Sequence, residues 1–410
     1  MGKLKSILIG AAAICCAVLS GTSTAAGEFM RNTAYLSAGG VDVDSSVNSE
    51  TSAEESGVSS ESSHIFGESG TADPLTESSS ESKPYSSPNT SINDESSAVT
   101  NSSVTSTTEP VPQKRGKVIT KNRVDGSDNE DYSQYTNKTG TIERLNFGYF
   151  DDPNIITLSS GAQVRNLTED TNEDLLAASR ELPSLGSFEG FELGSEEPQV
   201  LIYHTHTSES FLPEGDSFDP DYPIRSSDDS RNMIAIGEAI CKALAERGIS
   251  SVHDCRVHDY PMFTGAYYRS ADTMLENLAE YPSIKIAIDI HRDGILNSDG
   301  SATAPIAEIN GKTAAQFMII TGCDGPETEI PEYMTNFKLS CLLQNCAETA
   351  YPTLARPMLF DYRNYNQSLF AGDLLIEVGS QGNSFDEALY TGELLGDILA
   401  DAVERLAKST

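Results

Sequence analysis

Basic residues are scarce in this chain of 410 residues. Lysine and arginine together number 27, against 62 aspartate and glutamate residues, which leaves a formal net charge of −35. A protein that binds nucleic acid neutralises phosphates with lysine and arginine, so this balance argues against a nucleic-acid partner. The acidic excess favours solubility and says little about the fold.

Cysteine is also rare, with seven residues in the whole chain. An odd, scattered set of this kind is not a disulfide framework, and no CxxC pair indicates a cysteine zinc site. Two cysteines lie in the N-terminal segment, and we expect the others to be small buried apolar side chains. These five are Cys241, Cys255, Cys323, Cys341 and Cys346.

Large apolar residues are few between residues 41 and 137, where Ser, Thr, Glu, Asp, Asn and Pro dominate. Burial there cannot offset the entropy lost on ordering the chain. We therefore predict a disordered Ser/Thr/Glu-rich linker over residues 27–140, which lets a tethered domain extend away from a membrane. The basic run at residues 114–121 is expected to be a solvated end of this linker.

The N-terminus has the pattern of a targeting segment. Lys3 and Lys5 precede an apolar stretch over residues 7–19, and small residues follow up to Ala26. The stretch has the length of a signal-peptide core and is shorter than the ~20 residues of a transmembrane helix. Residues 1–26 are thus predicted to be a signal peptide or a membrane anchor. Both alternatives place the rest of the protein outside the cytoplasmic membrane.

Strand-like and helix-like segments alternate from residue 200 onward. Residues 200–203, 284–290 and 374–378 read as strands, and residues 232–246 and 384–406 read as helices. This alternation predicts a three-layer α/β/α domain with a mostly parallel sheet over residues 200–410. Residues 141–199, with a strand near 155 and a short helix near 173, are predicted to be its N-terminal extension.

Three of the predicted strands end in residues suited to metal binding or acid–base chemistry. His206 and Glu209 follow the first strand, His291 ends the second, and Glu377 ends the third. Two imidazoles and one carboxylate are a common catalytic Zn²⁺ set, and a further carboxylate can transfer protons. Because sites in such sheets gather at the carboxyl ends of strands, we predict His206, Glu209 and His291 as ligands and Glu377 as the catalytic acid/base.

Several alternatives remain open from the residues alone. His204 is a possible replacement ligand, and Asp228 is the runner-up for the carboxylate ligand. Asp289 is better placed to support His291 than to bind metal. Arg292 either pairs with Asp293 or binds a substrate carboxylate, and Asn383 is predicted to hold a peptide substrate.

These motifs together resemble the stage II sporulation protein P family. The resemblance rests on residues 201–211, 268–270, 281–285, 289–293 and 376–379, which include LIYHTHTSESF, DIHRD and IEVG. It implies a zinc amidase-like fold and a peptidoglycan hydrolase, an N-acetylmuramoyl-L-alanine amidase and endopeptidase that acts during engulfment in sporulation. It also implies a partner, the lytic transglycosylase stage II sporulation protein D.

Two other functions remain as alternatives to the amidase. One is a zinc carboxypeptidase that trims stem peptides, because the order HxxE, His, Glu also occurs in such enzymes. The other is a wall-binding scaffold without turnover. The resemblance leaves the carboxylate ligand undecided, since cell-wall amidases place it before the first helix, near Asp228, whereas we predict Glu209.

Overall fold

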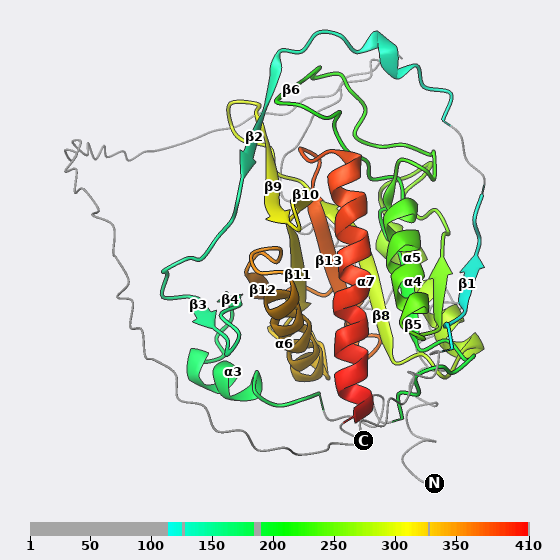
Figure 1. The fold of residues 1–410 in the computed structure, drawn as a ribbon, viewed down its shortest axis with the longest axis vertical. Coiled ribbons are helices and arrows are strands. Elements are labelled where there is room, and N and C mark those ends of the chain that lie inside the picture. Colours follow the sequence, from blue (N-terminus) through cyan, green and yellow to red (C-terminus); the bar gives the residue numbers. More distant parts are fainter. Residues whose placement is uncertain (1–113, 125–127, 184–189, 327–328, 409–410) are drawn as a thin grey trace, which may run out of the picture. The chain divides into compact units, whose positions relative to one another are not determined.

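The computed structural model describes residues 114–124, 128–183, 190–326 and 329–408 (Figure 1). The predicted signal peptide or anchor, and the predicted linker up to residue 113, lie outside these residues. All five cysteines named above are buried and unpaired, as expected. In the described part of the chain, no helix is long and apolar enough to cross a membrane.

A nine-stranded sheet forms the centre of the domain. Neighbouring strands β13 and β11, and β4 and β3, run antiparallel, whereas the other neighbours in this sheet are parallel. In spatial order the strands are β1 (Val118–Lys121), β7 (Ser251–Asp254), β5 (Val200–Tyr203), β8 (Ile286–Asp293), β13 (Asp373–Ser380), β11 (Phe317–Gly322), β12 (Met358–Asp361), β4 (Gln163–Asn166) and β3 (Ile155–Thr157).

Helices cover both faces of this sheet, so the predicted three-layer α/β/α architecture is confirmed. Successive side chains of β5 point to opposite faces of the sheet. On one face, Val200 and Ile202 pack in the large core, to which helices α4 (Met233–Glu246), α6 (Tyr333–Ala350) and α7 (Phe385–Lys408) also contribute. On the other face, Leu201 and Tyr203 pack against Met274 of helix α5 (Ala266–Glu280). Figure 1 shows α6 and α7 lying along the strands.

The ends of α4 follow from its local sequence. The side chain of Asn232 accepts a hydrogen bond from the amide of Ile234 and caps the first turn. Gly248 stops the helix with a left-handed φ of 78°, a conformation that costs glycine little. The helix predicted over residues 232–246 is thus confirmed to within one residue at its start.

A second sheet and a short helix complete the described part. The four strands, in spatial order, are β10 (Lys312–Ala315), β9 (Ala302–Ile309), β2 (Gly140–Leu145) and β6 (Ser217–Phe218). Strand β2 comes from the predicted N-terminal extension and pairs in parallel with β9. Helix α3 (Asn172–Ala178) and the 3-10 turn η1 (Tyr132–Gln134) lie in the same N-terminal part of the sequence.

The structure differs from the predicted linker over residues 114–140. Val118–Lys121 forms β1, which adds to the large sheet by pairing in parallel with β7. The segment is half-exposed and basic, and sequence alone read it as a solvated run. A strand at the edge of a sheet needs only backbone partners, which the side-chain composition does not reveal. The ordered part therefore begins earlier than predicted.

Candidate active site

Three parallel neighbouring strands bring the predicted site residues to one edge of the sheet. β5, β8 and β13 run the same way, and Glu377 of β13 is in register with His291 of β8. Both residues lie on the face covered by α5, because Ile290 and Ile376 beside them enter the opposite core. His291 was predicted at the end of its strand and lies two residues before the end of β8, which continues to Asp293.

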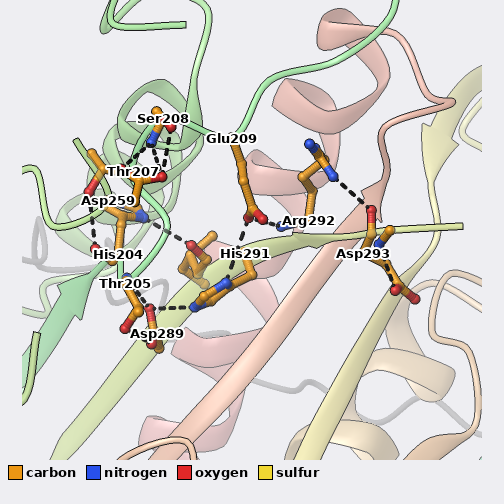
Figure 2. Close-up of polar contacts among 12 residues, drawn as sticks. His204, Thr205, Thr207, Ser208, Glu209, Asp259, Asp289, His291, Arg292 and Asp293 are labelled. Carbon is orange, nitrogen blue, oxygen red and sulfur yellow. Dashed lines mark hydrogen bonds and ion pairs between the residues drawn. The ribbon is translucent and has the colours of Figure 1, made fainter. Parts of the chain in front are cut away.

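A tight turn after β5 brings Glu209 back toward His291. The amide of Glu209 donates to the carbonyl of His206 at 3.1 Å, which closes the turn. Glu209 Oε2 then lies 3.6 Å from His291 Nδ1 and accepts a hydrogen bond from the amide of Arg292 at 3.2 Å. Figure 2 shows the Glu209 carboxylate directed at His291. The HxxE spacing thus places a carboxylate beside a histidine that lies 82 residues further along the chain.

Asp289 supports His291 from the far side of its ring. Its Oδ1 lies 2.9 Å from His291 Nε2, close in distance but not aligned as a hydrogen bond. Thr205 holds this carboxylate through its amide at 2.8 Å and its hydroxyl at 2.6 Å. The arrangement directs Nδ1 of His291 toward Glu209, which is the supporting role predicted for Asp289.

His206 completes a group of buried polar side chains. Its ring lies 5.3 Å from that of His291 at 88°, and its Nδ1 is buried without a hydrogen-bond partner among the described residues. Burial lowers the pKa of His206 to about 3, so the ring is neutral and keeps a free lone pair at physiological pH.

Glu209 and His291, the neighbours of His206, are both stabilised in their charged forms. Burial opposes the ionisation of Glu209, but contact with His291 and the charge of Arg292 outweigh it and hold its pKa below the usual value. Burial likewise opposes the charge on His291, but Asp289 and Glu209 outweigh it and raise its pKa. His291 is therefore held between two carboxylates.

The pKa of Glu377 is shifted in the opposite direction from that of Glu209. Burial, followed by the charge of Asp293, raises its pKa to about 8 despite the opposing charges of His291 and Arg356. Its Oε2 is buried without a partner among the described residues. A carboxyl with a pKa near physiological pH can both accept and donate a proton, which is the property predicted for the acid/base residue.

A metal site is not preassembled in this arrangement. In the described ranges, no three His, Cys, Asp or Glu side chains form a group that could hold a metal ion as they stand. The donor chemistry nevertheless fits Zn²⁺, because a neutral imidazole with a buried unpaired nitrogen lies beside a second imidazole and an ionised carboxylate. The second imidazole, that of His291, would lose its proton on binding Zn²⁺. The ligand roles of His206, Glu209 and His291 stay predictions.

The two reserve ligands lie elsewhere. His204 turns away from this group, with Nδ1 3.1 Å from the carbonyl of Ile290 and Nε2 3.0 Å from Nε2 of His253. Asp228 accepts hydrogen bonds from the amide and hydroxyl of Ser230 near the start of α4. None of these hydrogen bonds involves His206 or His291.

Arg292 is engaged by the backbone beside the site, and its predicted role in substrate binding stays a prediction. Its buried guanidinium donates to three backbone carbonyls, those of Ser210 at 2.7 Å, Ile224 at 3.0 Å and Asp293 at 3.2 Å. It therefore fixes the loops beside the site and has little capacity left for a ligand. Its position on β8, one residue after His291, directs it to the opposite face of the sheet.

Asn383 is likewise structural. Its side chain is fully buried, accepts from the amide of Ser380 at 2.9 Å, and donates to the carbonyl of Pro305 and the carboxylate of Glu387. These bonds hold the turn between β13 and α7. The turn itself uses both polar atoms of the side chain, and peptide binding by Asn383 stays a prediction.

Aromatic side chains that the sequence did not single out line the site. Phe263 stacks on His206 with ring centroids 4.3 Å apart, and Tyr267 stacks on His291 at 6.2 Å. Both come from the segment that begins α5. Burial and neighbouring acidic groups raise the pKa of Tyr267 well above its usual value, so it stays a phenol. Their place near the motif Tyr268-Arg269-Ser270 was the only local hint.

A family model and a known protein of Bacillus subtilis both match the sequence of this chain. The model of a family described as stage II sporulation protein P (SpoIIP) matches residues 53–400. The chain is 28% identical over 215 residues to stage II sporulation protein P of Bacillus subtilis (strain 168), covering 49% of this chain. That match spans only 50% of the relative's own length.

Solved structures of amidases show a weaker likeness. The CwlD amidase from Clostridioides difficile, solved in complex with the GerS lipoprotein, is 13% identical with a TM-score of 0.34, covering 52% of this chain and 100% of that one. The N-acetylmuramoyl-L-alanine amidase AmiC2 of Nostoc punctiforme is 14% identical with a TM-score of 0.30, covering 52% and 97%. Likeness at this level does not by itself establish a shared activity.

The family assignment rests on the sequence match and on the strand-end motifs that the fold brings together. The match covers most of the chain, including the described residues from Lys114 to Ala400. The resemblance read from HTHTSE, DIHRD and IEVG is thereby confirmed. This chain belongs to the stage II sporulation protein P family.

Proposed function

We propose that this protein is a peptidoglycan hydrolase of sporulation, a zinc-dependent N-acetylmuramoyl-L-alanine amidase that also cleaves stem peptides as an endopeptidase. The observation that carries the proposal is the Glu377 carboxyl, with a pKa raised to about 8, in register with His291 at the edge that also holds His206 and Glu209. Family membership supports the choice of peptidoglycan as substrate.

The residues divide into a binding group and a proton-transfer group. His206, Glu209 and His291 would hold Zn²⁺, and Asp289 would keep His291 in its orientation. Bound zinc would polarise the scissile carbonyl and lower the pKa of water. Glu377 would accept the proton of the attacking water and return it to the departing amine nitrogen. Phe263 and Tyr267 would limit access of bulk water to this face.

The family also motivates a proposal for the cellular setting. We propose that the protein acts outside the cytoplasmic membrane, attached or exported through residues 1–26, and faces the cell wall during engulfment. Stage II sporulation protein D is the proposed partner, acting on glycan from which the peptides have been removed.

Product analysis on purified peptidoglycan tests the activity. We expect the wild-type protein to release whole stem peptides, identified by mass spectrometry, and a chelator to stop the release. Glu377→Gln should reduce the rate by about 10²- to 10⁴-fold because it removes the acid/base group. Glu393→Gln, a matched change at an exposed position of α7, should leave the rate unchanged.

Four outcomes would contradict the proposal in distinct ways. Release of single terminal amino acids would indicate a carboxypeptidase. Undiminished hydrolysis by Glu377→Gln would exclude its acid/base role, and undiminished hydrolysis in chelator would exclude the metal. Binding to peptidoglycan without any product would indicate a scaffold.

A further inference from the structure

Arg356 lies at the same sheet edge as the candidate active site. Ala355 bridges to Phe317 of β11, and the amide of Arg356 donates to the carbonyl of Phe317 at 2.8 Å. Because β11 and β12 run opposite to β13, their first residues lie beside the last residues of β13.

The register places Arg356 in line with the site. Met318 pairs with Glu377, and Glu377 pairs with His291, so these residues form one row across the sheet. Arg356, one residue after Ala355, continues that row on the far side of Met318. Two strand spacings of about 4.8 Å separate its backbone from that of Glu377, which is within reach of two long side chains. Residues of one row share a face of the sheet.

The guanidinium of Arg356 is buried and only partly paired. The residue is 5% exposed, and Nη1 donates to Oδ2 of Asp293 at 2.9 Å. Nε and Nη2 are both buried with no hydrogen-bond partner among the residues the structure describes. A buried guanidinium with unmade hydrogen bonds is costly, so two donors left in this state require an explanation.

The two unpaired nitrogens share one edge of the guanidinium. Nε–H and the adjacent N–H of Nη2 point the same way, and this edge matches the two oxygens of a carboxylate in a bidentate pair. Asp293 occupies the Nη1 side only. Arg292 differs in this respect, because its Nε, Nη1 and Nη2 all donate to backbone carbonyls.

We propose that Arg356 is a substrate-binding residue, whose Nε and Nη2 bind a free carboxylate of the peptide substrate beside the scissile amide. Asp293 holds the guanidinium in place through Nη1. The charges of both residues act on Glu377, which supports their closeness to the acid/base group. This inference rests on the proposed function for the nature of the substrate. The carboxylate belongs either to a side group of the peptide or to its C-terminus, and the test distinguishes the two.

Two pairs of N-acetylmuramoyl peptides test this inference. In one pair a side-group carboxylate is replaced by a carboxamide, and in the other the C-terminal carboxylate is replaced in the same way. We expect the wild type to favour the carboxylate in one pair by roughly 10- to 100-fold in kcat/KM, mainly through KM, as for a charge-assisted bidentate contact. Arg356→Gln should abolish this preference, so that the two members of the pair are cleaved with equal kcat/KM.

Two further variants separate binding from folding. Arg356→Lys keeps the charge but not the planar fork, and we expect it to regain only part of the preference. Arg165→Gln, a matched change at an exposed arginine of β4, should keep the full preference. Urea unfolding of each variant shows whether the fold is intact.

Equilibrium binding of the same peptides makes the result independent of turnover. A carboxylate preference in Kd that disappears in Arg356→Gln supports the inference even where no peptide is cleaved, and that outcome contradicts the hydrolase proposal alone. Equal binding of both members of each pair by the wild type overturns the inference. So does an equal loss of rate on carboxylate and carboxamide peptides in Arg356→Gln, which would make Arg356 a partner of Asp293 only.

Discussion

Two buried histidine clusters lie on either side of the turn after β5, and they differ in how far their hydrogen bonds are satisfied. In the closed cluster, His204 and His253 face each other through Nε2 atoms 3.0 Å apart, and His258 bonds to the carbonyl of His204 and to Thr273. In the open cluster, His206 keeps a buried nitrogen without a partner among the described residues.

The closed cluster admits one consistent set of tautomers. His204 Nδ1 faces the carbonyl of Ile290 and must donate to it, so its Nε2 must accept from His253. His253 Nδ1 is then left to accept from the thiol of Cys255, 3.7 Å away. Every ring nitrogen of this pair has a partner, which is typical of a structural network. The difference teaches that burial alone does not indicate a functional histidine. A buried ring nitrogen that lacks a hydrogen-bond partner does indicate one.

The largest expected effect comes from making the same substitution, histidine to asparagine, once in each cluster. His206→Asn should reduce peptidoglycan hydrolysis by more than about 100-fold, beyond the usual loss for an outer-shell partner of a metal, because it removes a proposed ligand. His253→Asn should instead reduce the free energy of unfolding by about 1–3 kcal/mol, because it leaves His204 without its partner. Hydrolysis assays and urea unfolding of both variants measure the two effects.

A reversal of these results would break the distinction. If His206→Asn mainly lowered stability and left hydrolysis intact, the open cluster would be structural. If His253→Asn stopped hydrolysis without a loss of stability, the closed cluster would belong to the site.

A substitution at Gly237 of α4 tests how tightly the two rings of the closed cluster are packed. A Cβ at this position would lie 2.6 Å from Nε2 of His253 and 2.7 Å from Nε2 of His204. Gly237→Ala should therefore reduce the free energy of unfolding by about 1–3 kcal/mol through overpacking, despite the better helix propensity of alanine. Urea unfolding measures this loss.

Gly148→Ala is the matched control, because its Cβ would meet only the side chain of Asn146 at an ordinary 3.5 Å. Equal stability of Gly237→Ala and the wild type would show that the two rings can move apart at little cost.

The smallest expected effect is a pH dependence of stability. Burial, followed by the charges of His204 and Arg123, holds the pKa of His253 well below its usual value. The unfolded chain thus binds a proton near pH 6.5 while the folded protein stays neutral there. Stability is complete above about pH 6.5 and falls below it by about 1.4 kcal/mol per pH unit for this group.

Urea unfolding at about pH 7.5 and about pH 5.5 measures this fall, with His253→Asn as the comparison. The variant should lose less stability than the wild type over this interval. An identical fall in both proteins would show that other groups account for it.

Much of the fold could be predicted from local sequence. The four apolar residues of β5 and the capped ends of α4 specify their elements within a few positions, since periodicity and end signals are local properties. The edge strand β1 was missed, because its pairing with β7 depends on a segment more than 100 residues away. Short edge strands carry little of the burial pattern from which strands are predicted.

The candidate site was predicted in part for similar reasons. Its chemistry follows from residue types at strand ends, and parallel strands bring such ends together. The partners of Arg292 and Asn383 could not be predicted, because these backbone carbonyls and this carboxylate are set by the loops around them. Nothing local to the sequence distinguishes Arg292 from Arg356.

The sequence by itself determined the main strands and helices from residue 200 onward, the residue types at the site and the family, because these depend on composition, periodicity and short motifs. Only the tertiary structure decided which histidine of the HTH segment is enclosed and which is open, and which arginine keeps two donors. His204 meets His253 across 49 residues, and Arg356 meets Asp293 across 63. Partners so far apart in the chain are chosen by sheet register, which adds contributions from the whole fold.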